Sequence, residues 1–172
     1  MVIYLTGFMG SGKSTLGKKL ASLAGLPFID LDREVELREK SDIATIFSER
    51  GELCFREAES KALRAIDTGT GAVIATGGGA PCFNDNMEFM NQTGITVYLR
   101  LTPAALTSRL EGARETRPLI EGLNGEKLLE FVEQKLRERE PYYLQSAIVY
   151  EGLGQDARAL LKEIRSKGGV SA

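Results

Sequence analysis

The residues best suited to chemistry stand near the start of the chain, in the run Gly7-Phe8-Met9-Gly10-Ser11-Gly12-Lys13-Ser14. This run fits the pattern G-x-x-x-x-G-K-[ST], in which glycines let successive backbone N–H groups point into one concavity that holds phosphate groups. In that chemistry Lys13 reaches the β- and γ-phosphates of a nucleotide, and the hydroxyl of Ser14 serves Mg²⁺. A helix that follows directly adds the positive end of its dipole. The predicted ATP-binding residues of this segment are Gly10, Ser11, Gly12, Lys13, Ser14 and Thr15.

Two other interpretations of this segment are weaker. A chance glycine-rich turn would match the pattern in about one per cent of chains of this length, and here the run also follows an apolar strand and opens an amphipathic helix. A dinucleotide-binding fingerprint needs a third glycine where Thr15 stands. Phosphate binding alone does not separate a kinase from a GTPase, a motor or a switch, but the sequence contains no guanine-reading N-K-x-D motif.

Asp30 and Asp32 stand at the end of a short apolar segment that we predict to be the second strand. Because the carboxyl ends of parallel strands face the ligand crevice, both side chains are expected near the metal and the acceptor. One of the two would help to hold the water shell of Mg²⁺, and the other would accept a hydrogen bond from an acceptor hydroxyl and act as base. Capping of the next helix is the competing structural role for Asp32.

Two further groups of residues suit an anionic acceptor. Arg56 and Glu59 are one helical turn apart and can pair, either as a solvated surface pair or as an arginine held to grip a carboxylate. Gly77-Gly78-Gly79 follows the strand predicted at 72–76, where glycines permit either a close approach of backbone to ligand or a loose turn. That strand lacks a Walker-B aspartate at its end, so an aspartate from the second strand would serve the metal instead.

Several arginines stand in or beside the stretch 111–125, whose irregular pattern predicts a mobile lid or a plain surface loop. Arg117 lies inside this stretch and Arg109 shortly before it. An arginine brought over the γ-phosphate on closure assists phosphoryl transfer, although each of these side chains suits a solvated surface equally. Arg139 is predicted to end a helix that Pro141 stops, where its charge would complement the helix dipole.

The elements that would position these residues alternate between short apolar runs and helical patterns, which indicates a parallel sheet covered by helices on both faces. The predicted strands are 2–6, 27–30, 72–76, 95–101 and 147–150. Helical periodicity marks segments at 16–24, 43–47 with a stop at Gly51, 55–66, a segment capped by Thr102-Pro103, 128–136 and 157–164. We expect a single three-layer α/β domain over residues 1–172.

The overall composition excludes several functional classes. The net charge of −2 provides no basic stripe for nucleic acid. The chain contains no histidine, which removes Ser-His-Asp chemistry, His-ligated zinc and a histidine base. The two cysteines form no paired motif, the first residues do not look like a signal peptide, and no apolar run reaches the roughly 20 residues of a membrane span. We therefore expect a cytoplasmic protein without membrane contact, and a monomer.

The motifs GFMGSGKST, DLD, FREAE, TGGGA, TRPLI and REREPYY, in this order, resemble the shikimate kinases over nearly the whole chain. The first motif is common to many NTPases, whereas the later ones in this order are more specific. The resemblance implies a P-loop NTPase fold of the nucleoside-monophosphate-kinase type, with sheet order 2-3-1-4-5, an acceptor-binding segment at 31–60 and a lid at 111–125. It also implies Mg²⁺-dependent transfer of the ATP γ-phosphate to shikimate, giving shikimate 3-phosphate on the way to chorismate and the aromatic amino acids.

The resemblance further implies a role for each site residue. Asp32 would bind the acceptor hydroxyls, and Arg56, braced by Glu59, would bind its carboxylate and ring together with Arg139. The glycines that would line the acceptor are Gly77, Gly78 and Gly79. The catalytic residues would be Lys13, Asp32 and Arg117, and the metal residues Ser14 and Asp30. The ATP contacts outside the phosphate loop would be Arg109 along the adenine, Arg117 on the phosphates and Gln155 near the adenine.

Three other functions are the alternatives. Gluconate kinase is also a small P-loop kinase for a carboxylated polyol, but the FR-x-x-E and GGG motifs point away from it. A nucleotide kinase would need a base-reading pattern, and the sequence contains none that we recognise. A non-catalytic nucleotide-binding domain would have lost Lys13, Arg117 or the acceptor arginines, and all of these are present.

Overall fold

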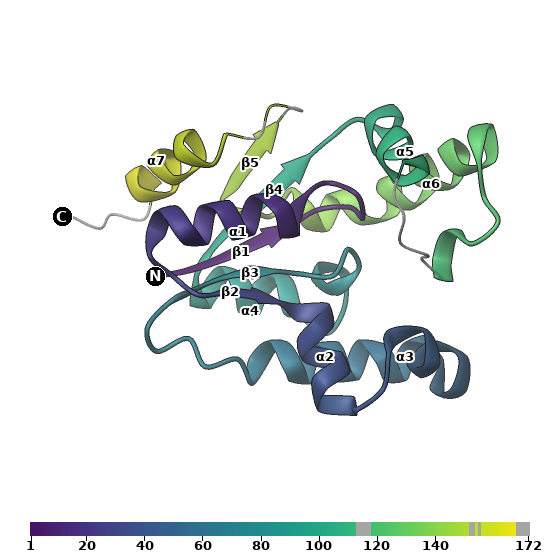
Figure 1. Ribbon diagram of the computed structural model, residues 1–172, viewed down its shortest axis with the longest axis horizontal. Coiled ribbons are helices and arrows are strands. Elements are labelled where there is room, and N and C mark those ends of the chain that lie inside the picture. The colour runs from purple at the N-terminus through teal and green to yellow at the C-terminus, as the bar shows by residue number, and fades with distance from the viewer. Residues whose placement is uncertain (113–117, 152–153, 155, 168–172) are drawn as a thin grey trace.

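The computed structural model describes residues 1–112, 118–151, 154 and 156–167, and its centre is a sheet of five parallel strands (Figure 1). The strand order is β2-β3-β1-β4-β5, which confirms the predicted fold class and sheet order. The strands are β1 Val2–Thr6, β2 Phe28–Asp30, β3 Ala72–Ala75, β4 Ile95–Arg100 and β5 Ile148–Glu151. Each of their ends lies within one residue of the predicted position.

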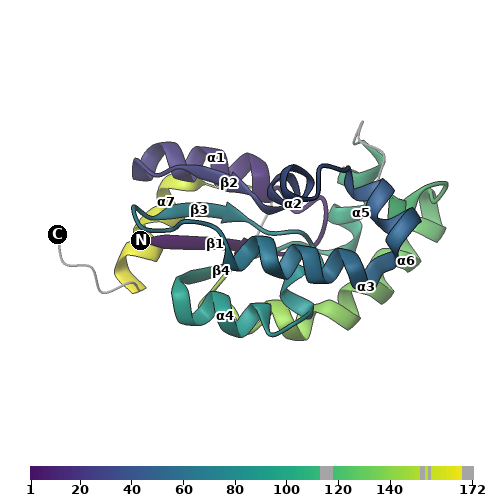
Figure 2. The same ribbon diagram turned by 90° about the horizontal axis from the view of Figure 1, so that it is seen from below.

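Helices cover both faces of this sheet, as Figures 1 and 2 show. One face is covered by α1 Lys13–Ala24 and α7 Ala157–Lys167, and the other by α3 Ile43–Arg64, α4 Asn86–Thr93 and α6 Gly125–Tyr143. Two shorter helices, α2 Leu31–Glu39 and α5 Pro103–Glu111, lie beyond the carboxyl ends of the strands. Two 3₁₀ turns complete the described elements, η1 Ala80–Cys82 and η2 Pro118–Ile120.

The continuous apolar character of the strands follows from this double cover. Along β1, Ile3 and Leu5 pack into the layer of α1 and α7, whereas Tyr4 packs into the layer of α3 and α4. Alternate residues of a strand point to opposite faces, so a strand buried on both sides needs apolar residues at every position. All three side chains are at most 1% exposed.

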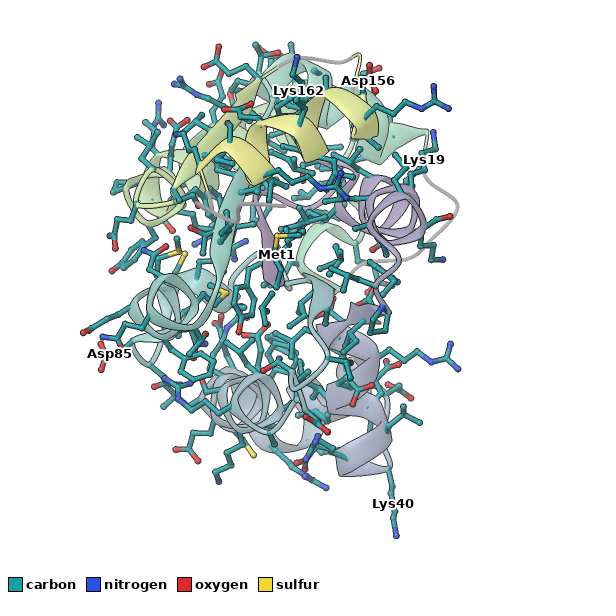
Figure 3. All side chains as sticks on the ribbon, turned by 90° about the vertical axis from the view of Figure 1, so that its left-hand side faces the viewer. Met1, Lys19, Lys40, Asp85, Asp156 and Lys162 are labelled. Atoms are coloured by element: carbon teal, nitrogen blue, oxygen red, sulfur yellow. The ribbon has the colours of Figure 1, made fainter. Side chains whose placement is uncertain are left out.

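Figure 3 views the molecule from the amino ends of the strands. Met1 lies between the two helical layers, Lys19 and Lys162 project from the layer of α1 and α7, and Asp85 projects from the opposite layer. The predicted phosphate loop, Asp32 and the three glycines follow the carboxyl ends of β1, β2 and β3, so they lie at the opposite end of the sheet, away from the viewer. No helix in the described ranges is long and apolar enough to cross a membrane.

Local signals explain most helix boundaries. The side chains of Asp30, Asp42 and Thr102 cap α2, α3 and α5 by accepting hydrogen bonds from backbone N–H groups, each worth about 1 kcal/mol. Gly51, with φ of 81° and ψ of 170°, interrupts α3 and separates it into two helical segments, as predicted. Helices α2 and α4 were not predicted from the sequence, because both are short and α2 buries only Leu31 and Val35.

The prediction that Pro141 ends its helix, with Arg139 at the helix end, is wrong. Helix α6 runs through Pro141 to Tyr143, and Leu144 N still donates to Glu140 O at 2.9 Å. Proline this close to the end of a helix removes one hydrogen bond without preventing the last turn. That turn is held by Tyr143, which is fully buried, packs on Tyr98 and donates its hydroxyl hydrogen to Gly78 O.

Candidate active site

The phosphate loop follows β1 and has the conformation that the motif requires. Gly7 has φ of 135° and Gly10 has φ of 80°. A Cβ on Gly7 would lie 2.9 Å from Leu99 O, and one on Gly10 would lie 3.1 Å from Leu110 Cδ2. Gly12, with φ of 95°, is the N-cap of α1, whose first residue is Lys13. The loop therefore curls against the end of β4 and α5, and it presents the N-terminus of α1 to a phosphate group.

The polar side chains of the loop are engaged with their surroundings. Lys13 Nζ donates to Gly7 O at 2.8 Å and to Phe8 O at 2.9 Å. Ser14 Oγ donates to Asp30 Oδ2 at 2.9 Å, which joins the start of α1 to the end of β2. The other oxygen of Asp30 accepts from Asp32 N at 3.2 Å, so Asp30 rather than Asp32 caps α2.

The predicted acceptor residues meet at the three glycines after β3. A Cβ on Gly77 would lie 2.7 Å from Asp32 Oδ1 and 2.5 Å from Glu59 Oε1. At this position only the hydrogen atom of a glycine leaves room for the two carboxylates. The glycines therefore allow charged side chains from three elements to converge. At Gly79 a Cβ would lie 2.6 Å from Arg56 Cζ, and at Gly78 it would lie 3.6 Å from Arg139 Nη1. The interpretation as a loose turn is excluded by these contacts.

Arg56 is a buried cation, because only 4% of its surface is exposed. Its Nη1 donates to Glu59 Oε2 at 2.9 Å, and Nη2 and Nε donate to Glu52 Oε1 at 3.1 and 3.3 Å. The pair with Glu59 is thus a buried ion pair and not the solvated surface pair of the alternative interpretation. The role of Glu52 was missed, although its i,i+4 spacing from Arg56 was a usable signal.

Glu59 is fully buried beneath the glycines. Burial raises the pKa of this carboxyl to about 7, although the nearby Arg56 opposes the shift. Its Oε1 has no hydrogen-bond partner among the described residues and faces the site at Gly77. A buried polar atom without a partner is expensive, so a ligand or solvent hydrogen-bond donor would be favourable there.

Arg139 adds a second buried guanidinium, with 8% of its surface exposed. It lies 5.6 Å from the centre of the Phe8 ring, which follows the first glycine of the phosphate loop. No ion pair between described residues involves Arg139. The carboxyl of Glu59 lies near enough to interact with this charge. A carboxylated ligand would add a direct ion pair to the buried cation, so the site is suited to such a ligand.

One cleft of about 1210 Å³ contains both halves of this site. The predicted residues that line it are Gly10, Gly12, Lys13, Ser14, Thr15, Asp30, Asp32, Arg56, Gly77, Gly78, Gly79, Arg109 and Arg139. Ser11 does not line the cleft because it is fully buried under the loop. Arg117 and Gln155 lie outside the described residues. A second cavity of about 670 Å³, between α5, α6 and the end of β5, contains none of the predicted residues.

Arg109 supports the outer side of the phosphate loop. Its Nη1 donates to Ser11 O at 3.1 Å and to Gly10 O at 3.4 Å. The residue lines the cleft beside the loop, and its contact with the adenine stays a prediction.

The oxygen ligands at the head of α1 fit Mg²⁺. Among the described residues, no cluster of three or more Asp, Glu, Cys or His side chains is placed to hold a metal ion alone. Mg²⁺ in kinases needs no such cage, because one or two protein oxygens, water and the nucleotide phosphates complete its coordination. The hydroxyl of Ser14 and the carboxylate of Asp30, 2.9 Å apart, provide two suitable oxygens beside the phosphate loop.

Comparison with known proteins agrees with this arrangement. The family model for shikimate kinase matches residues 9–167. The shikimate kinase of Parabacteroides distasonis is 47% identical over 161 residues, which cover 94% of this chain and 90% of the relative. The crystal structure of shikimate kinase from Bacteroides thetaiotaomicron superposes with a TM-score of 0.87 at 39% identity, covering 99% of both chains.

A shikimate kinase from Acinetobacter baumannii, solved in complex with shikimate, has a TM-score of 0.80 at 35% identity and covers 94% of this chain and 89% of its own. A gluconokinase from Sinorhizobium meliloti shares the fold alone, with a TM-score of 0.54 at 16% identity. The alternative of a gluconate kinase is therefore not supported by the comparisons. From its motifs, its sheet order and these matches, the chain belongs to the shikimate kinase family of ATP-dependent kinases.

Proposed function

We propose that this chain transfers the γ-phosphate of ATP to the 3-hydroxyl of shikimate, giving shikimate 3-phosphate and ADP, a step toward chorismate and the aromatic amino acids. The observation that carries the proposal is the pair of buried guanidiniums, Arg56 and Arg139, beside the carboxylate of Asp32 and at one end of the cleft that holds the phosphate loop. An acceptor with one carboxylate and several hydroxyls matches this set of charges.

The acceptor is held at the three glycines. Its carboxylate lies between Arg56 and Arg139, and it gives Arg139 a direct ion pair, which this residue does not make with any other described residue. Hydrogen bonds between guanidinium and carboxylate are about twice as strong as neutral ones. The hydroxyl to be phosphorylated lies at Asp32, and the bare backbone of Gly77 and Gly78 lets the side chains of Asp32 and Arg139 come close to the acceptor.

ATP is held at the other end of the cleft. The backbone N–H groups of residues 10–15 and the head of α1 surround its phosphates. Lys13 exchanges its present contacts with Gly7 O and Phe8 O for the β- and γ-phosphate oxygens. Arg117 acts on the phosphates from the lid at 111–125, while Arg109 and Gln155 contact the adenine.

Transfer is a displacement at the γ-phosphorus. The acceptor oxygen forms a bond to phosphorus, the bond from phosphorus to the β,γ-bridging oxygen breaks, and ADP leaves. Asp32 accepts the hydrogen bond of the attacking hydroxyl and receives its proton. Lys13, Arg117 and the loop N–H groups neutralise charge that develops on the phosphoryl oxygens.

Ser14 and Asp30 are the residues that would hold Mg²⁺ in the ternary complex, since their oxygens already lie 2.9 Å apart beside the loop. When bound, Mg²⁺ neutralises the phosphate oxygens of ATP. Asp30 would then exchange the hydrogen bond from Ser14 for the water shell of the metal. We place the whole activity in one domain, residues 1–172, acting as a monomer in the cytoplasm with segment 31–60 as the acceptor-binding part.

The test is the release of ADP by the purified protein with Mg-ATP, with shikimate and gluconate offered separately, and the product identified by ³¹P NMR. We expect turnover with shikimate and background release with gluconate. Tight ATP binding without turnover of shikimate would refute the assignment of the acceptor and leave the phosphate-loop assignment intact.

A further inference from the structure

The guanidinium of Arg56 has a defined set of donors left for a ligand. Its three hydrogen bonds to Glu52 and Glu59 use Nε–H and one N–H of each terminal nitrogen. A guanidinium carries five N–H groups in one plane. Within the described part of the chain, one N–H therefore remains on each terminal nitrogen. Because these N–H groups lie in the plane of the guanidinium, they reach a carboxylate only if that plane is held in one orientation.

Two aromatic rings lie against this guanidinium. Arg56 Cζ is 4.6 Å from the centre of the Phe83 ring and 5.0 Å from that of the Phe55 ring. Phe55 lines the acceptor cleft, but Phe83 does not. An effect of Phe83 on the acceptor must therefore act through Arg56. A ring within about 6 Å of a cation attracts it and keeps water from its face.

Asn84 attaches the segment that carries Phe83 to the helix that carries Arg56. Its side-chain Nδ2 donates to Arg56 O at 3.2 Å and to Ser60 Oγ at 3.0 Å, both on α3. Asn84 and Asp85 have φ of 49° and 54°, a left-handed pair that turns the chain from η1 into α4. Figure 3 shows Asp85 projecting from the molecule, which places the outer side of this turn at the surface.

A second arginine holds the same turn from further along α3. Arg64 Nη2 donates to Asn84 O at 2.8 Å, and Arg64 Nη1 donates to Asn86 Oδ1 at 2.5 Å. Asn86 in turn donates to Ala80 O at 2.9 Å, which connects the turn to the residue after the three glycines. The turn is thus bonded to α3 on both sides of Ser60 and to the glycine loop, which keeps the ring of Phe83 in register with Arg56.

We infer that Phe83 is a positioning residue for the acceptor: its ring, held by the Asn84 turn, fixes the guanidinium plane of Arg56 so that the two remaining N–H groups receive the acceptor carboxylate. The inference rests on the proposed function for the identity of the acceptor, and on the contacts above for the role of the ring. Neither Phe83 nor Asn84 lines the cleft, so the inference assigns them an effect on acceptor affinity and not on the transfer step.

The kinetic test compares Phe83→Leu with Phe83→Tyr and with the control Phe131→Leu. Phe131 is another partly buried ring, but it lies on α6, outside the cleft and away from the Asn84 turn. Loss of a buried cation–ring contact is expected to raise the KM for shikimate about five- to tenfold in Phe83→Leu. The KM for ATP and kcat should stay within about twofold of the wild type. Phe83→Tyr keeps the ring and should keep the KM for shikimate near that of the wild type, and Phe131→Leu should leave it unchanged.

A second measurement needs no substrate. The Nε–H signal of Arg56 is identified by its absence from the spectrum of Arg56→Lys, and its exchange with water is followed by NMR in the ligand-free protein. We expect exchange to be several-fold faster in Phe83→Leu and in Asn84→Gly, which removes the amide but tolerates the left-handed φ. In Phe131→Leu the Nε–H of Arg56 should exchange at the rate of the wild type.

The outcomes separate the two proposals. A wild-type protein that does not phosphorylate shikimate refutes the proposed function, while the exchange measurement still decides the role of Phe83. If the wild type is active but Phe83→Leu changes neither the KM for shikimate nor the exchange of Arg56, the inference is overturned. It is also overturned if Phe83→Leu raises the KM values for shikimate and ATP equally, or if Phe131→Leu has the same effect, because either result indicates a general loss of structure.

Discussion

Replacing Gly79 by alanine should act on the acceptor through Arg56. The added Cβ would lie 2.6 Å from both Cζ and Nη1 of Arg56, closer than real carbon contacts. Arg56 cannot turn away without breaking its bonds to Glu52 and Glu59, because it is buried between them. The displaced guanidinium would lose its charge-assisted hydrogen bond to the acceptor carboxylate, worth about 1.5–3 kcal/mol.

That free energy corresponds to a KM for shikimate raised about 10- to 150-fold, with the KM for ATP unchanged. Steady-state kinetics with each substrate varied in turn gives both values. Gly69→Ala is the matched control, because its Cβ would meet only the exposed side chain of Asp67 at 3.3 Å. A thermal melt of each variant separates unfolding from the local effect.

A double-mutant cycle tests the reasoning directly. If Gly79→Ala acts by moving Arg56, it should have little further effect in an Arg56→Ala background, where the clashing atoms are gone. A Gly79→Ala protein with a normal KM for shikimate, or one whose effect simply adds to that of Arg56→Ala, would refute the argument that this glycine exists to admit the guanidinium.

Four further predictions concern single groups of the site. Asp32→Asn should lower kcat about 10²- to 10⁴-fold with a smaller change in the KM for shikimate, measured by steady-state kinetics; a change confined to KM would contradict the role as base. Arg139→Ala should raise the KM for shikimate about 10- to 150-fold and leave the KM for ATP unchanged, and equal changes in both would contradict it. Removing Mg²⁺ with EDTA should abolish turnover, and Ser14→Ala should need more Mg²⁺ for half-maximal rate; an unchanged Mg²⁺ requirement would exclude Ser14 as a ligand. Burial raises the pKa of Glu59 to about 7 from an ordinary value of 4.5, so the folded protein holds this proton to a higher pH than the unfolded chain. The free energy of unfolding of the wild type should therefore fall by up to about 3 kcal/mol, relative to that of Glu59→Gln, as pH rises from about 4.5 to 7. Parallel stability curves of the two proteins in urea titrations would contradict this.

The parts of the fold that could be predicted from sequence are those with a strong local cause. The five strands are mostly apolar because both faces of the sheet are covered, and their ends were predicted to within one residue. Gly51 and Thr102 mark helix boundaries by backbone conformation and capping, and both were predicted. Helix α2 has only two buried residues and depends on packing against α3, which no local pattern contains.

At Pro141 the local sequence predicted a helix end that the structure does not have. Its local preference to end a helix is real, but the next turn is held by Tyr143 in contact with β4 and Gly78. Tertiary contacts between residues 45 or more positions apart decide this boundary, and sequence spacing does not reveal them.

In the candidate site, too, some residues could be predicted from the sequence and others could not. The phosphate loop was predictable because one continuous motif contains both its conformation and its chemistry. Burial of Arg56 was not, because the i,i+3 spacing from Glu59 is equally typical of an exposed pair. The structure decides between these interpretations with an exposure of 4% for Arg56 and 0% for Glu59. Phe83 carried no sequence signal at all, since it stands 27 positions from the guanidinium it covers.

The register of the sheet explains why donor and acceptor meet. Leu5 in β1 and Asp30 in β2 both align with Ala75 in the strand between them. Two residues past these aligned positions stand Gly7 at the start of the phosphate loop, Asp32 in the first turn of α2, and Gly77 at the start of the three glycines. All three therefore lie just beyond the carboxyl edge of the sheet, on segments that leave neighbouring strands about 4.8 Å apart.

The outer two strands of this trio are consequently about 10 Å apart, with the glycines between them. In the proposed complex, this span holds the γ-phosphate at the phosphate loop and the acceptor hydroxyl at Asp32. At Gly77 the carboxylates of Asp32 and Glu59 occupy the space that a side chain on the middle strand's loop would need. The strand order is therefore consistent with the absence of a Walker-B aspartate after β3: the position that follows this strand must lack a side chain, and β2 and α2 supply Asp30 and Asp32 instead.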